Sequence, residues 1–233
     1  MKTGSRTHDK FYLKEDRKHT PKEYFKFVVA KLPFSLNNKR VLDIGCATGD
    51  FLHYLSELFP KSLLFGADVD KELIDRAKIE VPKVQEYFKL DIGSESRDIG
   101  KYDVVFMLSV HPIWDEVDVW VDPVLKLLKK SPESRAYIFG SWNPYGLDVL
   151  VRIRKHGEEK LELGWNQISK ETVGSYLESL GYKYKFHDFS LNIEMERRDD
   201  PLRSWTEKME NGKFLVMNGT QIVHCLSLLE IKL

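Results

Sequence analysis

Short apolar runs alternate with longer amphipathic segments over the first two thirds of the chain. Most of the runs are apolar at nearly every position, which is typical of strands buried on both faces of a sheet. The pattern predicts strands at residues 40–44, 62–69, 84–90, 103–110 and 135–140. Apolar residues at helical spacing predict helices at 24–32, 50–59, 71–79 and 114–130, and Pro123 should kink or divide the last of them. Strands that alternate with helices predict an α/β fold, with a parallel sheet covered on both faces.

The last third of the chain has a different pattern. Residues 166–180 predict a helix, with Ser169 as a candidate cap, and residues 182–191 and 220–233 predict two long strands. A polar insertion at 192–219 separates these strands. Within the insertion, Asn211-Gly212 is typical of a hairpin turn.

Composition narrows the function classes. The 36 Lys and Arg residues balance the 36 Asp and Glu residues, so the simplest argument for nucleic-acid binding, a strongly basic protein, does not apply. The charge is uneven, however, and residues 1–40 carry a net charge of +7. This basic arm leaves contact with an anionic substrate or nucleic acid open, beside the plainer interpretation of a solvated arm.

The number of cysteines and the length of the apolar stretches indicate the cellular compartment in which the protein is expected. Cys46 and Cys225 are too few for a disulfide framework, and no Cys/His cluster predicts a metal site. The amino-terminal residues lack the pattern of a secretory signal, and no apolar run approaches the ~18 residues of a membrane span. We therefore expect a cytoplasmic protein with reduced thiols.

A glycine-rich turn follows the first predicted strand. That strand contains Asp43 and runs into Gly45-Cys46-Ala47-Thr48-Gly49, and Asp68 ends the next strand. Glycine lets a ligand approach the backbone closely, and an acidic residue beside the turn can accept hydrogen bonds from both hydroxyls of a ribose. Asp43 and Asp50 would repel the pyrophosphate of a dinucleotide, so the pattern favours an adenosine-containing ligand that carries positive charge. The alternative is that the aspartates only cap turns and helices.

These motifs resemble those of the class I S-adenosylmethionine-dependent methyltransferases, whose first motif has the form D-x-G-x-x-x-G. The resemblance covers about residues 25–145 and includes FGADVD around Asp68 and the Leu90-Asp91-Ile92 motif. It implies a three-layer α/β sandwich with a seven-stranded, mostly parallel sheet in the order 3-2-1-4-5-7-6, strand 7 being antiparallel. The chain would then be a single methyltransferase domain, 1–233. Its parts would be an amino-terminal helical arm or lid (1–36), a cofactor-binding half (37–145), and a substrate-side half (146–233) with the insertion 192–219.

The resemblance also implies the cofactor, S-adenosyl-L-methionine, with S-adenosyl-L-homocysteine as product. The first motif would line its methionine and ribose parts, Asp68 would hold the ribose, Val69 and the Asp91 motif would meet the adenine, and the Ser109 carbonyl would face the methionine ammonium group. The cofactor-binding residues implied in this way are Asp43, Gly45, Cys46, Ala47, Gly49, Asp68, Val69, Asp91, Ile92 and Ser109.

Candidate acceptor-side residues follow the fourth and fifth strands. His111 is the candidate catalytic base, because its ordinary pKa near 6.5 suits proton abstraction from a hydroxyl; the alternative is a packing role. Other positions could wall an acceptor pocket or meet an anionic group, and Phe11 with Tyr12 could form an amino-terminal lid. The candidate substrate-binding residues are Tyr12, Trp114, Trp142, Arg152 and Arg203.

The sequence favours a methyltransferase acting on a small molecule, at oxygen in preference to nitrogen. The expected acceptor is a sugar or phosphorylated biosynthetic precursor, such as one for a surface glycan. An RNA or protein methyltransferase that uses the basic arm is the alternative, and a non-catalytic fold that keeps or has lost the cofactor is a third. Asn143-Pro144-Tyr145 resembles the N-P-P-Y motif of nucleic-acid amino-methyltransferases but follows the wrong strand. We expect no membrane or nucleic-acid partner and no metal, and both a monomer and a homodimer remain open.

Overall fold

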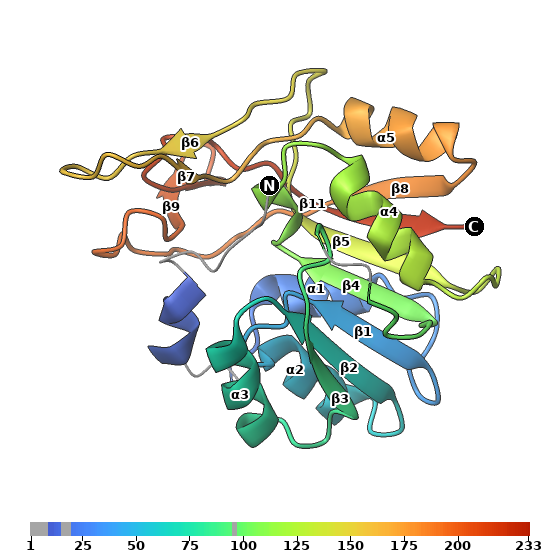
Figure 1. Cartoon of the computed structure of the whole chain (residues 1–233). Helices are drawn as coiled ribbons and strands as arrows, with labels where there is room; N and C mark the ends of the chain where they lie inside the picture. The colour runs from blue at the N-terminus through green and yellow to red at the C-terminus, as the bar shows by residue number, and fades with distance from the viewer. Residues whose placement is uncertain (1–8, 15–19, 95–96) are drawn as a thin grey trace.

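A seven-stranded sheet forms the centre of the molecule in the computed structural model, which describes residues 9–14, 20–94 and 97–233 (Figure 1). Its strand order is β3-β2-β1-β4-β5-β11-β8. The strands are β1 (Arg40–Ile44), β2 (Leu63–Asp68), β3 (Glu86–Lys89), β4 (Val104–Leu108), β5 (Arg135–Ser141), β8 (Lys183–Asp188) and β11 (Leu226–Lys232). The first five are parallel to one another, and β11 is antiparallel to both of its neighbours. This confirms the predicted order, with β8 and β11 as the sixth and seventh strands.

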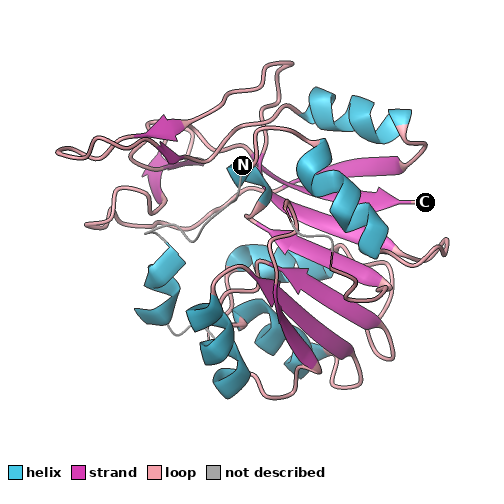
Figure 2. Cartoon of the chain, in the orientation of Figure 1, coloured by secondary structure: helices cyan, strands magenta, loops and turns pink. Residues whose placement is uncertain are grey.

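Helices cover both faces of the sheet and give a three-layer α/β sandwich (Figure 2). They are α1 (Glu23–Ala30), α2 (Asp50–Leu58), α3 (Lys71–Glu80), α4 (Asp118–Leu127) and α5 (Lys170–Ser179), with 3-10 turns η1 (Asp9–Lys14) and η2 (His111–Ile113). One face buries apolar residues of α1 and α2, and the other buries those of α4 and α5. Within the described ranges, no helix has the length and apolarity that crossing a membrane requires.

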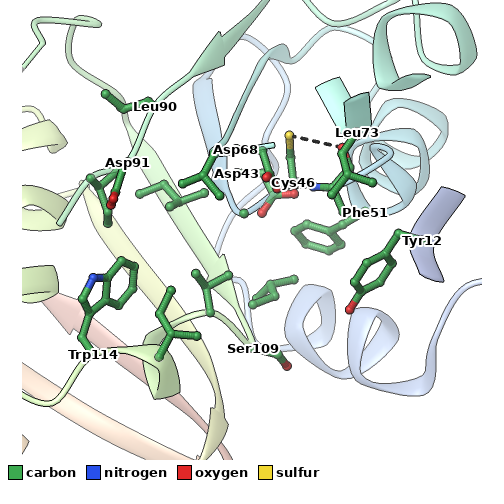
Figure 3. A pocket seen from close by; sticks show the side chains of 18 of the residues that line it. Tyr12, Asp43, Cys46, Phe51, Asp68, Leu73, Leu90, Asp91, Ser109 and Trp114 are labelled. Carbon is green, nitrogen blue, oxygen red and sulfur yellow. Dashed lines mark hydrogen bonds between the residues drawn. The ribbon is translucent and has the colours of Figure 1, made fainter. Parts of the chain in front are cut away.

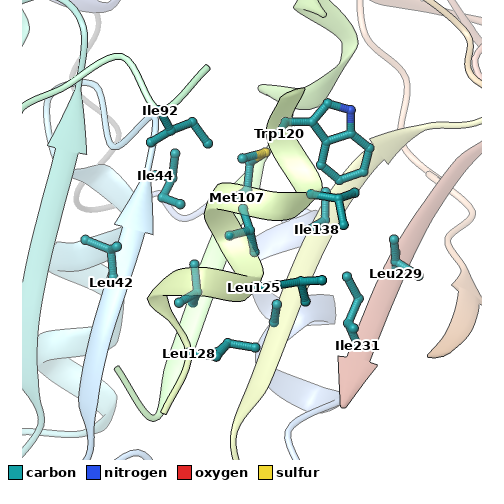
Figure 4. Packing of buried hydrophobic residues seen from close by; sticks show 14 of the residues in the cluster. Leu42, Ile44, Ile92, Met107, Trp120, Leu125, Leu128, Ile138, Leu229 and Ile231 are labelled. Atoms are coloured by element: carbon teal, nitrogen blue, oxygen red, sulfur yellow. The ribbon is translucent and has the colours of Figure 1, made fainter. Parts of the chain in front are cut away.

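The core consists of two apolar layers separated by the sheet. In β4, Val105 and Met107 belong to one layer, whereas Val104 and Phe106 belong to the other. Successive side chains of a strand point to opposite faces, so a continuous apolar run is what a strand covered on both sides requires. Figure 4 shows the first layer, in which Trp120 and Leu125 of α4 lie over the sheet.

Several predicted boundaries shift. The helix predicted at 114–130 begins only at Asp118, because η2 and an extended Trp114 precede it, and Pro123 lies inside α4 without dividing it. The strand predicted at 220–233 begins at Leu226, after a loop in which Gln221 has a positive φ of 61°. The Asn211-Gly212 turn is confirmed, since β9 (Trp205–Lys208) and β10 (Phe214–Met217) pair as an antiparallel hairpin. A second short hairpin, β6 (Arg152–Ile153) with β7 (Glu162–Leu163), has no counterpart in the prediction.

Candidate functional site

The glycine turn after β1 is held against the end of β2. The backbone N–H groups of Gly45 and Cys46 both donate to the Ala67 carbonyl, at 2.7 and 3.1 Å. Gly45 has a φ of 74°, which residues with a side chain rarely adopt. A Cβ there would lie 2.2 Å from Val110 Cγ2. The turn thus needs glycine at position 45 for two reasons: the positive φ, and the close approach of the Val110 side chain.

Asp68 fixes the turn and the start of α3 at once. One carboxylate oxygen accepts from Ala47 N and the other from Asp70 N, each at 2.9 Å. The cap of α3 is Asp70, whose side chain accepts from Glu72 N and Leu73 N. These bonds join the glycine turn to the start of α3, and Asp68 also lines the cavity described below. A role toward a ligand therefore stays a prediction, beside the interpretation that Asp68 only stabilises the turn.

Asp91 stabilises a tight turn after β3. Its two carboxylate oxygens accept from Gly93 N at 3.0 Å and from Ser94 Oγ at 2.9 Å. The side chain is buried, and the residue still lines a cavity together with Leu90 and Ile92. Asp91 therefore combines a structural role in this turn with an accessible position at the sheet edge.

The three aspartates meet around one cavity of about 490 Å³ at the carboxyl ends of the parallel strands. Figure 3 shows Asp43 and Asp68 near its middle, with Asp91 and Tyr12 toward opposite sides. Phe51, Leu73 and Leu90 give it apolar walls. The predicted cofactor residues that line it are Asp43, Gly45, Cys46, Ala47, Asp68, Val69, Asp91, Ile92 and Ser109. Gly49 is not among the lining residues and is the N-cap of α2.

The cavity has a negative character. Its acidic lining residues are Asp43, Asp50, Asp68, Asp91 and Glu162, and the basic ones are Lys22 and Lys160. Burial raises the pKa of Asp43 well above its ordinary value, the charge of Asp68 raises this pKa further, and Lys22 opposes both effects. A positively charged ligand would stabilise the ionised carboxylates, so the site favours cations over anions.

A second cavity, of about 620 Å³, adjoins the first. Both are lined by Tyr12, Lys22, Tyr24 and Ser109. Ser109 directly follows β4 and has a positive φ of 63°. Its backbone N–H donates to the Phe139 carbonyl at 2.7 Å. The two cavities therefore meet beside a residue held in a strained conformation, a kind of strain that often accompanies functional sites.

The second cavity is apolar at its base and charged at its rim. Tyr24 stacks on Phe139 with ring centroids 4.7 Å apart, and Phe189 packs edge-on against Phe139. The rim contains residues of both signs: Glu23, Glu194, Glu196, Arg197, Arg198 and Arg203. Such a cavity suits a small molecule with an apolar face and a polar end.

Comparisons with known proteins agree with this geometry. Residues 42–131 match the model of a methyltransferase domain family. Protein 235L of Invertebrate iridescent virus 6, which is named as a methyltransferase, is 39% identical over 69 residues, or 30% of this chain and 25% of that protein. The solved structure of YcgJ from Bacillus subtilis superposes with a TM-score of 0.59 at 14% identity, covering 89% of this chain and 97% of YcgJ. That of the DhpI–SAH complex gives 0.54 at 14% identity, covering 83% and 76%.

This is the fold of the class I, Rossmann-like S-adenosylmethionine-dependent methyltransferases. The aligned region is a quarter to less than half of the length of the curated relatives that the chain matches. The similarity lies mainly in the part of the methyltransferase fold that contains the glycine turn and the strand-end aspartates.

The predicted acceptor-side residues of this methyltransferase fold separate into two groups. Tyr12 lines both cavities, Trp114 the first and Arg203 the second, with the Arg203 guanidinium 5.9 Å from the Tyr12 ring centre. Trp142 is fully buried in the apolar core and lines neither cavity. Arg152 also lies outside both cavities and forms an ion pair with Asp115. The Phe11 side chain lies outside the described part of the chain.

His111 occupies a packing position. Its ring is fully buried, stacks on Trp142 with centroids 4.0 Å apart, and lines neither cavity. Gly140 makes room for it, since a Cβ there would lie 2.2 Å from His111 Cε1. In this arrangement, His111 does not reach a ligand in either cavity, so the base role stays a prediction that the geometry does not favour.

Replacing His111 by phenylalanine should make the fold less sensitive to acid. Burial lowers the pKa of His111 to about 3 from an ordinary value of 6.5. Between these pH values only the unfolded chain takes up the proton, so this contribution to stability is complete above pH 6.5 and declines as the pH falls toward 3. Urea unfolding should show wild-type stability falling more steeply than that of His111→Phe, by about 1.4 kcal/mol per pH unit between roughly pH 5.5 and 4. Equal slopes would contradict the neutral, buried imidazole.

Some lining residues had no sequence signal. Lys22, the N-cap of α1, and Tyr24 in its first turn line both cavities. No sequence motif predicts a role for either residue. Leu161 and Leu163 reach the first cavity from the β6–β7 hairpin, which was not predicted. His224 lines the second cavity from a loop that was predicted as strand. Contacts between segments that are far apart in the sequence bring these residues to the site, and local sequence patterns do not predict such contacts.

Proposed function

We propose that the chain is an S-adenosylmethionine-dependent methyltransferase that acts on a small molecule, at oxygen in preference to nitrogen. The observation that carries the proposal is the negative cavity around Asp43, Asp68 and Asp91, next to a second cavity with an apolar base. A cationic sulfonium nucleoside matches the first cavity in charge, and the glycine turn allows close approach of a ligand to the backbone. The similarity of the fold to that of DhpI, solved as a complex with SAH, supports the same cofactor class.

The residues of the first cavity would hold the cofactor. When bound, S-adenosylmethionine supplies a methyl group activated by a positively charged sulfur. The Asp68 carboxylate would accept hydrogen bonds from ribose hydroxyls, and its bonds to Ala47 N and Asp70 N keep it fixed in the wall of the cavity. Asp43 would remain ionised beside a cation, despite its burial. Ser109 lies where the cavities meet, so its backbone can orient groups at their junction.

The second cavity would hold the acceptor. Its aromatic walls exclude water and can lie against a flat apolar face, and alignment of the acceptor is the main contribution that such a site makes. A neutral hydroxyl needs a base, and His111 is buried away from the cavity. An oxygen that is already ionised needs none. We therefore favour a carboxylate or a phosphorylated precursor, and a sugar compound such as a surface-glycan precursor stays within this class.

Binding of S-adenosylhomocysteine tests the proposed function directly. We expect it to raise the melting temperature and to bind at one site by calorimetry, because ligands of the folded state stabilise it. ADP-ribose is the matched control: it shares the adenosine but carries a pyrophosphate, which the aspartates should reject. The proposal would be contradicted if S-adenosylhomocysteine neither raised the melting temperature nor bound by calorimetry, or if ADP-ribose bound equally well. The macromolecular alternative depends on a basic arm that lies partly outside the described residues, and it remains a prediction.

A further inference from the structure

His224 lies in the wall of the second cavity and has a buried ring nitrogen, Nε2, without a hydrogen-bond partner among the described residues. Its backbone N–H donates to the Val216 carbonyl at 2.8 Å, which ties the loop before β11 to the β9–β10 hairpin. Buried polar atoms are nearly always paired with protein or water, so an unpaired ring nitrogen in a cavity wall could pair with water or with a ligand that fills the cavity.

Gln167 and Ser141 determine which hydrogen-bonding role Nε2 has. Both side chains are more than nine-tenths buried. The Ser141 hydroxyl donates to Gln167 Oε1, so the amide nitrogen of Gln167 is the atom turned toward the ring, 3.5 Å from His224 Nδ1. That nitrogen carries only hydrogens and cannot accept a bond. This orientation of the Gln167 amide is compatible with an unprotonated Nδ1 that accepts from it.

With Nδ1 as the acceptor, the neutral ring carries its proton on Nε2. Burial also lowers the pKa of His224, which keeps the imidazole neutral and leaves a single N–H. In this tautomer Nε2 is a hydrogen-bond donor and cannot take a proton from a substrate hydroxyl. The group suits recognition of an oxygen that accepts a hydrogen bond, and not general-base chemistry.

We propose that His224 determines acceptor specificity by donating a hydrogen bond from Nε2 to an ionised oxygen of the methyl acceptor, with Gln167 and Ser141 as positioning residues. The inference rests on the proposed function, because it takes the second cavity as the acceptor site. The acceptor class is a small anion with a flat apolar body, which would lie against the aromatic rings of Tyr24, Phe139 and Phe189. Ligands of the same shape that offer only donors should be rejected, because they would leave Nε2–H unpaired.

The tautomer is tested without any ligand. Nitrogen-15 chemical shifts of the labelled His224 ring should report a protonated Nε2 and a bare Nδ1 in the wild-type protein. In Gln167→Glu, a carboxylate replaces the amide and can only accept, so the proton should move to Nδ1. A wild-type ring protonated at Nδ1, or a ring that Gln167→Glu leaves unchanged, would overturn the proposal whatever the cofactor does.

Binding is tested with benzoate and benzylamine, which share a flat ring and differ in the polar group. Both are titrated into protein saturated with S-adenosylhomocysteine. We expect benzoate to bind and benzylamine not to, and His224→Phe to weaken benzoate binding by about tenfold. His224→Gln keeps an N–H donor and should stay within about threefold of wild type. Affinity for S-adenosylhomocysteine and the melting temperature should stay near wild type in both His224 variants, which shows that the fold is intact.

The outcomes separate the two proposals. Benzoate that binds His224→Phe as well as wild type, or that does not bind the wild-type complex at all, would overturn the role of His224 while the cofactor assignment stands. A wild-type protein that does not bind S-adenosylhomocysteine would instead overturn the proposed function. The tautomer of His224 would still be measurable in that case, so the two failures cannot be confused.

Discussion

Asp68→Ala should lose S-adenosylhomocysteine binding, with Kd rising by about 100-fold or more. The carboxylate would accept hydrogen bonds from the ribose, and bonds to a charged group contribute about 1.5–3 kcal/mol each. The substitution also frees the N–H groups of Ala47 and Asp70, which Asp68 now holds at 2.9 Å each. Loss of these two bonds loosens the glycine turn and adds to the loss of affinity. Isothermal calorimetry measures the effect.

Two further variants separate the causes. Asp68→Asn retains the shape and one acceptor oxygen, so it should bind more weakly than wild type and more tightly than Asp68→Ala. Asp75→Ala is the matched control, because Asp75 is a half-exposed α3 carboxylate that pairs with Lys71 across one helical turn. Its affinity should equal that of wild type. If Asp68→Ala bound within threefold of Asp75→Ala, about 0.7 kcal/mol, Asp68 would have no part in the site.

Gly45→Ala should both destabilise the fold and abolish cofactor binding. The new Cβ would overlap Val110 Cγ2 at 2.2 Å, and the φ of 74° is unfavourable for alanine. Strain of this backbone kind costs about 1–3 kcal/mol and overpacking about 1–3 kcal/mol more. The turn would have to move away from β4 to relieve the overlap. Urea unfolding and S-adenosylhomocysteine titration would record the two losses.

Gly157 provides the control for backbone strain. Its φ is 82°, close to that of Gly45, but a Cβ there would have nothing within 4 Å. Gly157→Ala should therefore show only the cost of the left-handed conformation, about 1–2 kcal/mol, and bind normally. Adding Val110→Ala to Gly45→Ala removes the overlapping methyl group and should recover part of the stability. Equal destabilisation by Gly45→Ala and Gly157→Ala would show that the contact with Val110 is unimportant.

The sheet and its edge could be predicted because their signals are local. A strand buried on both faces needs an apolar residue at nearly every position, and β4 and β5 show this directly in the sequence. Parallel strands joined by helices then bring their carboxyl ends to one edge. That topology is enough to gather Asp43, Asp68 and Asp91 at a single cavity.

The acceptor side could not be predicted as well, because it depends on which way single side chains point. Ser141 and Trp142 are adjacent at the end of β5, and the strand alternation turns Ser141 toward the second cavity and Trp142 into the core. The sequence analysis named Trp142 as a candidate wall of an acceptor pocket and did not name Ser141. His111 follows β4 as predicted, but the 3-10 turn η2 places its ring against Trp142. His224 comes from a loop far along the chain, and no local pattern indicates its position.

The antiparallel direction of β11 has a practical consequence for labelling the protein. Leu226 pairs with Ser141 at the ligand-binding edge, whereas Lys232 pairs with Arg135 at the start of β5. Leu233 therefore lies at the opposite end of the strands from both cavities, where Figure 1 marks the carboxyl end. A fluorophore or affinity label placed at this end of β11 would be remote from small molecules bound in the two cavities, and immobilisation through it would leave both cavities open to solution.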